Sequence, residues 1–333
     1  MKKLLATTAI VSVSFASAAL SETKVSGSIE QTFNSISYDK AANQVTGTDS
    51  IGQETNVKFS SSKELDNGMK LDGSFNLEDS AIDSSSLKVS GDAMYFEIGA
   101  DTGTHIATTI NPRVGDEAWA VAGATATDSL TGHSDYSGYA AHDVQHIGIG
   151  GNFGGMSAHV NYAPSSNGIS SGDSSKTDSG GSATEFVIKG SPMDGLSILL
   201  GQQSLTGGDT AATKDIDEKT YQIAYSQDAW AIGYSHREID DNDGSETAGK
   251  TDAVNYLSAT YAVSDTVSLG IQHITAESEG TGTSASDEVT KSLSIGYSLG
   301  PVGVEVMYAT TEDKAHSSGD DTSGVQIRSV MKF

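Results

Sequence analysis

The final stretch of the chain, residues 324–333, reads GVQIRSVMKF. Apolar and polar side chains alternate in it almost to the last residue: Val325, Gln326, Ile327, Arg328, Met331, Lys332 and Phe333. A period of two is typical of a β-strand with one apolar face. Most domains end in a polar, poorly ordered tail. A strand that continues to Phe333 therefore predicts that the terminal residues are needed by the sheet.

The same alternation recurs along the chain and predicts sixteen strands. After residue 21 the sequence has no run of about 18 apolar residues, so a transmembrane helix is not expected. The apolar positions of the expected strands fall at 25–33, 57–59, 69–77, 87–89, 94–98, 147–149, 156–162, 186–188, 196–200, 221–225, 230–234, 257–261, 267–271, 293–297, 302–308 and 325–333.

The polar faces of these strands decide where the apolar faces lie. In a soluble sandwich the apolar face packs inward, whereas in a membrane barrel it meets lipid and the polar face lines a lumen. Asp72, Asn76 and Glu78 follow one another on a single polar face. Such a row needs water along the whole strand, which favours a membrane barrel.

Short and long connections alternate between the expected strands. Short turns fall at 64–68, 90–92, 152–155, 191–195, 226–228, 264–265 and 300–301, and longer polar loops near 39–50, 79–84, 101–143, 164–182, 205–216, 239–250, 276–287 and 312–321. This asymmetry and an even strand number are typical of bacterial outer-membrane barrels with short periplasmic turns and long extracellular loops. We predict an all-β fold, a 16-stranded antiparallel transmembrane barrel, with the last strand paired to the first because lipid cannot satisfy a sheet edge.

Residues 1–21 have the layout of a secretory signal peptide. Two lysines precede an apolar stretch at 4–15, and small residues follow it. Cleavage after Ala18 and cleavage after Ser21 both fit this pattern. The expected organisation is a signal peptide at 1–21 and a single barrel domain at 22–333.

Composition excludes several classes of protein. The formal net charge is −25 and no basic stripe is present, so nucleic-acid binding is not expected. The chain has no cysteine, which excludes a disulfide scaffold and thiolate metal sites.

The whole sequence resembles the Gram-negative general porins of the trimeric, 16-stranded type. The resemblance runs from the signal through TKVSGSIEQTF (23–33), SPMDGLSILLG (191–201) and YAVSDTVSLGIQH (261–273) to Phe333. It implies a passive diffusion channel for small hydrophilic solutes and ions, located in the outer membrane among its lipids and lipopolysaccharide. It also implies homotrimers, and a terminal strand with Met331 and Phe333 that is read by the barrel-assembly machinery.

The resemblance further implies that the third long loop, 101–143, folds into the lumen and makes a constriction. Acidic residues outnumber basic ones among the loop and wall candidates, so we expect the pore to prefer cations. The chain contains only three arginines, so the arginine cluster of many family members is not expected. The constriction candidates are Asp101, Arg113, Asp116 and Glu117 on the loop, and Lys58, Lys88, Glu97, Arg237 and Arg328 on the wall. Other charged wall positions are Glu54, Asp72, Glu78, Glu185, Lys189 and Glu305.

Enzyme and metal motifs are weak in this sequence. Residues 296–300 match G-x-S-x-G, but they close a strand before a Gly-Pro turn instead of opening a helix, so no catalytic residue is predicted. His133, His142 and His146 do not form the ligand set of a zinc site. No cofactor is expected beyond loose association of divalent cations with acidic loops such as 240–244. A structural or adhesin barrel and an outer-membrane enzyme barrel stay open as alternatives.

Overall fold

The computed structural model describes residues 23–40, 44–79, 81–100, 102–106, 108–115, 118–122, 145–164, 182–206, 216–240, 251–278 and 286–333. Sixteen strands make up most of this part of the chain. Their bounds are β1 (Thr23–Lys40), β2 (Gln44–Glu64), β3 (Lys70–Glu78), β4 (Ala81–Ser90), β5 (Met94–Ala100), β6 (His146–Phe153), β7 (Met156–Ala163), β8 (Ser182–Met193), β9 (Leu196–Thr206), β10 (Ile216–Gln227), β11 (Trp230–Asp240), β12 (Thr251–Ala262), β13 (Val267–Ser278), β14 (Glu288–Leu299), β15 (Val302–Glu312) and β16 (Asp321–Lys332). The short helix α2 (Ala118–Ala122) lies between β5 and β6, and the 3₁₀ turn η2 (Lys314–His316) lies between β15 and β16.

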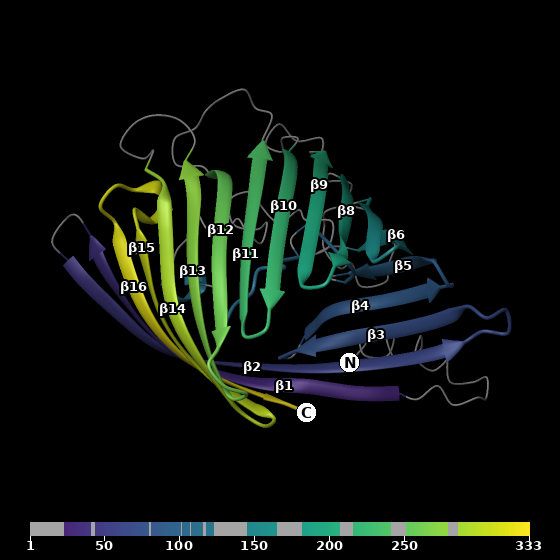
Figure 1. Cartoon of the computed structure of the whole chain (residues 1–333), viewed down its shortest axis with the longest axis horizontal. Helices are drawn as coiled ribbons and strands as arrows, with labels where there is room; N and C mark the ends of the chain where they lie inside the picture. Colours follow the sequence, from purple (N-terminus) through teal and green to yellow (C-terminus); the bar gives the residue numbers. More distant parts are fainter. Residues whose placement is uncertain are drawn as a thin grey trace.

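The strands form one closed antiparallel barrel. Each strand pairs with its neighbour in sequence, and β16 pairs with β1. Figure 1 shows this order as a colour gradient around the sheet, from purple β1 to yellow β16. The closed 16-stranded barrel predicted from the sequence is thus confirmed. Within the described residues, no helix has the length and apolar character needed to cross a membrane.

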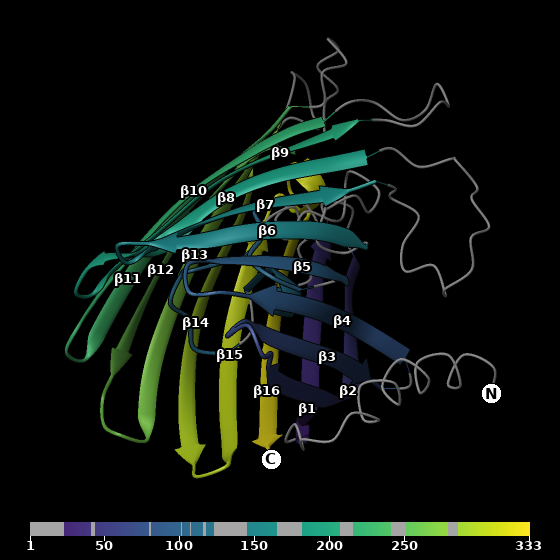
Figure 2. The same ribbon diagram turned by 90° about the vertical axis from the view of Figure 1, so that its right-hand side faces the viewer.

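The closing seam between β1 and β16 continues to the last residue. It runs from the pair Asp39 and Asp321 to the pair Ser28 and Lys332. Beyond it, Gly27 and Phe333 exchange two backbone hydrogen bonds of 2.9 and 3.0 Å. Figure 2 shows the end of β16, marked C, beside the turn that joins β14 to β15. The terminal strand leaves no unpaired edge there, which is the role that its alternating pattern predicts.

The faces of the barrel are the reverse of those of a soluble protein. On β11, the outward-facing Trp230 and Tyr234 are each 42 % exposed, whereas Ser235 and Arg237 on the lumenal face are 3 % and 2 % exposed. Exposed apolar side chains recur on the outer face around the barrel. Because such a surface is stable only when lipid covers it, the lipid-facing assignment made from the sequence holds.

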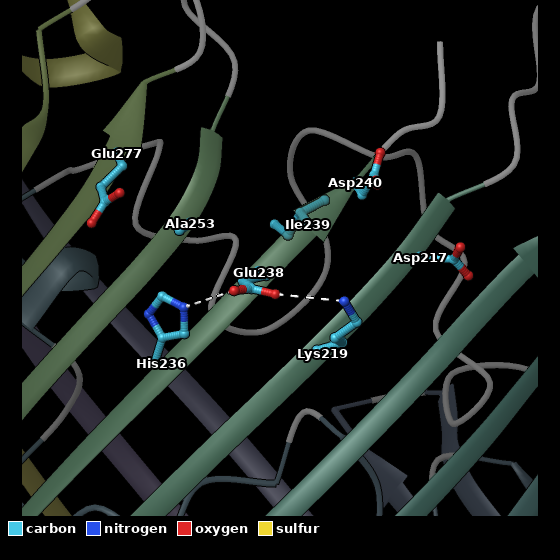
Figure 3. Close-up of a pocket in the computed structure, with 8 residues that line it drawn as sticks. All are labelled: Asp217, Lys219, His236, Glu238, Ile239, Asp240, Ala253 and Glu277. Atoms are coloured by element: carbon cyan, nitrogen blue, oxygen red, sulfur yellow. Dashed lines mark ion pairs between the residues drawn. The ribbon is translucent and has the colours of Figure 1, made fainter. Parts of the chain in front are cut away.

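Charged side chains replace apolar ones on the outer face toward the rim with the long loops (Figure 3). Figure 3 shows Glu238 between His236 and Lys219, with Oε1 3.6 Å from His236 Nε2 and Oε2 3.7 Å from Lys219 Nζ. On the outer face of β11, His236 and Glu238 directly follow Tyr234. The change marks the level at which the outer face leaves the apolar band and meets headgroups and water. A shallow pocket at this level is lined by Asp217, Lys219, His236, Glu238, Ile239, Asp240, Ala253 and Glu277.

Short turns and long connections lie at opposite rims, as predicted. The tight turn between β6 and β7 uses Gly154 and Gly155 with φ values of 56° and 82°, which glycine adopts without strain. Two expected long loops are shorter in the structure. Residues 44–50 belong to β2 and residues 81–84 belong to β4, because backbone pairing extends strands through polar segments that have no apolar periodicity.

The remaining sequence motifs are placed as follows. The G-x-S-x-G match at 296–300 lies on β14 and on its turn to β15, where no helix follows. The expected signal peptide at 1–21, together with His133 and His142, lies outside the described residues.

Candidate pore constriction

The third long connection enters the barrel directly after β5. Thr102 Oγ1 donates a hydrogen bond to Glu97 Oε1 (2.9 Å), and the Ile106 N–H donates to Glu185 Oε2 (2.8 Å). Asn161 Nδ2 donates both to Glu185 Oε1 (2.7 Å) and to the Thr104 carbonyl oxygen (3.0 Å). The Glu185 side chain is fully buried. A buried carboxylate is stable only when it is hydrogen-bonded, so these contacts fix the start of the loop on β5, β7 and β8.

The middle of the loop is held by β10 and β12. Gln222 on β10 accepts a hydrogen bond from the Ile110 N–H (2.9 Å) and donates one to the Thr108 carbonyl oxygen (2.7 Å). Further along, Asn111 Nδ2 donates to the carbonyl oxygen of Tyr256 on β12 (3.2 Å). One lumenal side chain thus satisfies both a donor and an acceptor of the loop backbone, which would otherwise need water.

Helix α2 ends the described part of the loop and docks on the far wall. Gln272 on β13 accepts a hydrogen bond from the Ala118 N–H (3.1 Å). Thr322 on β16 donates one to the Ala122 carbonyl oxygen (2.6 Å). Beneath α2 lies an apolar cluster inside the lumen, which we call the helix seat: Val254, Tyr256, Ile274, Ala276, Met307 and Ala309, packed against Ala118, Val121 and Ala122.

The loop therefore follows the inner wall from β5 through β8, β10, β12 and β13 to β16. These hydrogen bonds lie on β5, β7, β8, β10, β12, β13 and β16, whereas the lumenal faces of β2, β3 and β4 form the adjoining side of the barrel. We call this side the open wall.

Arg328 joins three strands at one edge of the open wall. Its Nε and Nη2 atoms donate to the two carboxylate oxygens of Glu30 on β1 (2.6 and 2.5 Å), and its Nη1 donates to Glu305 on β15 (3.0 Å). This bidentate arrangement is the strongest type of charge-assisted contact. The guanidinium charge is therefore shared by two carboxylates, and the group carries a net negative charge.

Other charged residues of the open wall face the lumen directly. Glu54 lies opposite Glu30 in the β1–β2 register, and Lys58 lies four residues further along β2, on the same face and nearer the short-turn rim. Both side chains are exposed. Lys88 Nζ lies 3.9 Å from the centre of the Tyr95 ring, a cation–π contact.

The nine constriction candidates predicted from the sequence fall into residues that are partly or fully exposed, buried residues and residues outside the described part of the chain. Lys58, Lys88 and Arg328 lie on or beside the open wall, and Arg113 is exposed on the loop. In contrast to the sequence-based assignment, two wall candidates are buried. Arg237 forms an ion pair with Glu218 (2.5 Å), and Glu97 accepts the hydrogen bond from the Thr102 hydroxyl. Asp101, Asp116 and Glu117 lie outside the described residues.

Sequence reasoning missed the residues that hold the loop. Gln222, Gln272 and Thr322 are uncharged, so a search for pore charges passes over them. The helix seat carries a clearer signal, because Val254, Ile274 and Met307 occupy lumenal positions where a water-filled barrel would have polar residues.

Comparison with known proteins agrees with this architecture. The family model described as Gram-negative porin matches residues 6–327. No curated protein matches the chain significantly.

Solved structures with the same architecture share little sequence with the chain. OmpT, an outer membrane protein of Vibrio cholerae, has a TM-score of 0.64 at 12% identity, covering 96% of this chain and 99% of that one. An anion-selective porin from Comamonas acidovorans has a TM-score of 0.64 at 15% identity, covering 94% and 100%. A mutant of the Rhodobacter blastica porin has a TM-score of 0.60 at 13% identity, also covering 94% and 100%.

Proposed function

Since the chain belongs to the Gram-negative porin family and forms a diffusion channel in the outer membrane, we propose that small cations pass through it more readily than anions. The solutes are small and hydrophilic, because a water-filled passage between loop and wall admits them by diffusion. The fold leaves the sign of the selectivity open, since a structural neighbour is described as anion-selective. The charges of the passage must therefore decide it.

The observation that carries the proposal is the pairing of the arginines. Arg328 is shared by Glu30 and Glu305, and Arg237 is buried against Glu218. Two of the three arginines are thus offset by carboxylates, and no cluster of guanidinium groups faces the open wall among the described residues. The formal net charge of −25 adds a long-range field that raises the local concentration of cations.

Reversal potentials in a KCl gradient across a planar bilayer test the cation preference. We expect the sign of a cation-selective pore, with selectivity that falls as ionic strength rises. Glu54→Gln and Lys58→Gln form a matched pair on the lumenal face of β2, with Asn56 between them. Each should shift the permeability ratio roughly two-fold, the first toward anions and the second toward cations, as expected for about 0.4 kcal/mol in water. An anion-selective unsubstituted protein would overturn the proposal.

We also propose that the chain is not an enzyme. The G-x-S-x-G residues lie in a strand and a turn, without the strand-to-helix elbow that this motif needs. The same bilayer experiment separates the channel from the other classes. Stepwise conductance supports the channel, a silent bilayer with folded protein supports a structural or adhesin barrel, and turnover of lipid or peptide supports an enzyme.

A homotrimer is proposed from the outer face of β16, β1 and β2. Gln31 faces outward in the middle of β1, opposite Gln53 on β2 and Ser329 on β16. Apolar Ile29 and Phe33 flank Gln31 on the same face. Amide groups are costly in contact with lipid tails. A second copy of the chain would cover these groups and hydrogen-bond them.

The double variant Gln31→Leu, Gln53→Leu tests this contact. If copies meet here, loss of the amide hydrogen bonds should weaken the trimer, by roughly 0.6 to 2 kcal/mol for each bond. The ratio of trimer to monomer on unheated gels, followed against temperature, measures the effect. Ile232→Leu on the outer face of β11 is the control. A trimer that is equally or more heat-resistant in the double variant would exclude this face as the contact.

A further inference from the structure

Glycines recur on the lumenal wall where the third loop lies against it. They occupy β9, β11, β13, β14 and β16, and a Cβ atom added at any of them would come within 3.2 Å of a loop atom. We propose that these residues form a glycine track that sets the distance between loop and wall, and with it the width of the passage. The proposal rests on the proposed channel function. The glycine track consists of Gly201, Gly233, Gly270, Gly296 and Gly324.

The order of the contacts supports a continuous track. Successive glycines around the barrel meet successive residues of the loop, so the loop and the wall advance together. Ile106 lies at Gly201, Pro112 at Gly233, Val114 at both Gly270 and Gly296, and Val121 at Gly324.

The shortest distances from an added Cβ are to loop atoms that cannot move unless the loop backbone moves with them. A Cβ at Gly233 would lie 2.5 Å from Pro112 Cδ and 3.1 Å from the Asn111 Cα. A Cβ at Gly324 would overlap the Val121 carbonyl oxygen and lie 2.9 Å from the carbonyl carbon. Pro112 Cδ belongs to a ring fixed to the backbone, and the other atoms are backbone atoms. A side chain at either position therefore requires the loop itself to shift, since a rotamer change does not relieve the overlap.

Hydrogen-bonding residues complement the track. Gln222 on β10 and Gln272 on β13 bond the loop backbone between its contacts with the glycines. The hydrogen bonds attract the loop to the wall, and the glycines let it come to backbone contact. The hydrogen bonds thus hold the loop against the wall, and the missing side chains of the glycines determine how close it can come.

The wall contains a matched glycine that none of the described loop residues contacts. Gly303 lies on the lumenal face of β15, in the same alternation as Glu305, and a Cβ there would meet no atom within 4 Å. A substitution at Gly303 adds the same volume to the lumen and the same change in strand propensity. It should leave the described part of the loop in place, because the added atoms meet none of its residues.

The experiment compares Gly233→Val and Gly324→Val with Gly303→Val in planar bilayers. Pushed away from the wall, the loop should narrow the passage, so single-channel conductance should fall further in the two track variants than in Gly303→Val. Loop position is measured separately through Val121→Cys, which introduces the sole thiol of the chain at a fully buried position. A membrane-impermeant maleimide should label this thiol faster when Gly233 or Gly324 is also replaced. Gly233→Ala is the milder variant if a valine variant does not fold.

Each outcome is decisive. Conductance or labelling rates in the track variants that equal those of Gly303→Val would overturn the glycine track. An unsubstituted protein that forms folded barrels but conducts no ions would instead refute the channel function, and the labelling rates would still test the track. The two failures are therefore distinguishable.

Discussion

Deletion of residues 331–333 is expected to abolish recovery of a folded barrel from the outer membrane. Met331 and Lys332 pair with Ile29 and Ser28 across the seam, and Phe333 exchanges two backbone hydrogen bonds with Gly27. Without these pairs the seam opens at the short-turn rim and leaves edge strands with unpaired backbone groups next to the lipid. The folded fraction is read from the heat-dependent mobility of membrane extracts on gels.

Phe333→Ala separates closure of the seam from recognition of the aromatic ring. This variant keeps the backbone pairs and loses only the ring. We expect it to fold in detergent and to be depleted from the outer membrane of cells, because we propose that the ring is read by the barrel-assembly machinery. Phe333→Tyr is the control and should assemble normally. A truncated protein that accumulates in folded form would contradict the role given to the seam.

Val121→Asp is expected to release the third loop and to raise the single-channel conductance by about two-fold or more, since the passage no longer has a narrow side. Val121 is fully buried on α2, against the helix seat. An unpaired carboxylate in such a place costs roughly 3–5 kcal/mol. The loop avoids that cost by moving into water, whereas the barrel keeps its strand pairs. Limited proteolysis of the folded protein should then cut the loop.

Val121→Ala is the matched variant for this prediction. It removes apolar contact without adding charge, and it should leave conductance close to that of the unsubstituted protein. Val121→Asp also adds a negative charge to the lumen, which shifts reversal potentials by itself, so conductance and proteolysis carry the comparison. A Val121→Asp protein with unchanged conductance and an uncut loop would show that the helix seat does not hold the loop in place.

The fold could be predicted from the sequence because its signal is repeated in every strand. Alternation places Trp230, Ile232 and Tyr234 on one face, and turn residues mark each hairpin at the short-turn rim. Closure was predicted from the strand pattern of residues 324–333, since both edges of a strand in lipid need a partner. The first two long loops were overestimated because a strand can continue through polar residues such as 44–50, where backbone pairing alone extends it.

The candidate site could be predicted only in outline. Strand parity placed Lys58, Lys88 and Arg328 on the lumenal face correctly. Parity could not tell an open lumenal position from a buried one, because burial depends on where the loop and its neighbours pack. Arg237 and Glu97 have the parity of pore residues, yet one is enclosed with Glu218 and the other anchors the loop. Residues such as Gln222 act through the path of the loop, which no local pattern encodes.

The contacts of Arg328 have a consequence for the use of this barrel as an engineered nanopore sensor. Its guanidinium bonds to residues on β15 and β1. The same side chain therefore stabilises the closure of the barrel and contributes to the charge of the passage. Replacing Arg328 to change the ion selectivity of such a sensor would therefore also weaken the seam between β16 and β1. Lys58 is exposed on the lumenal face of β2, two strand periods away from Glu54 and the Glu30 pair, so it is the better position for an analyte-specific residue.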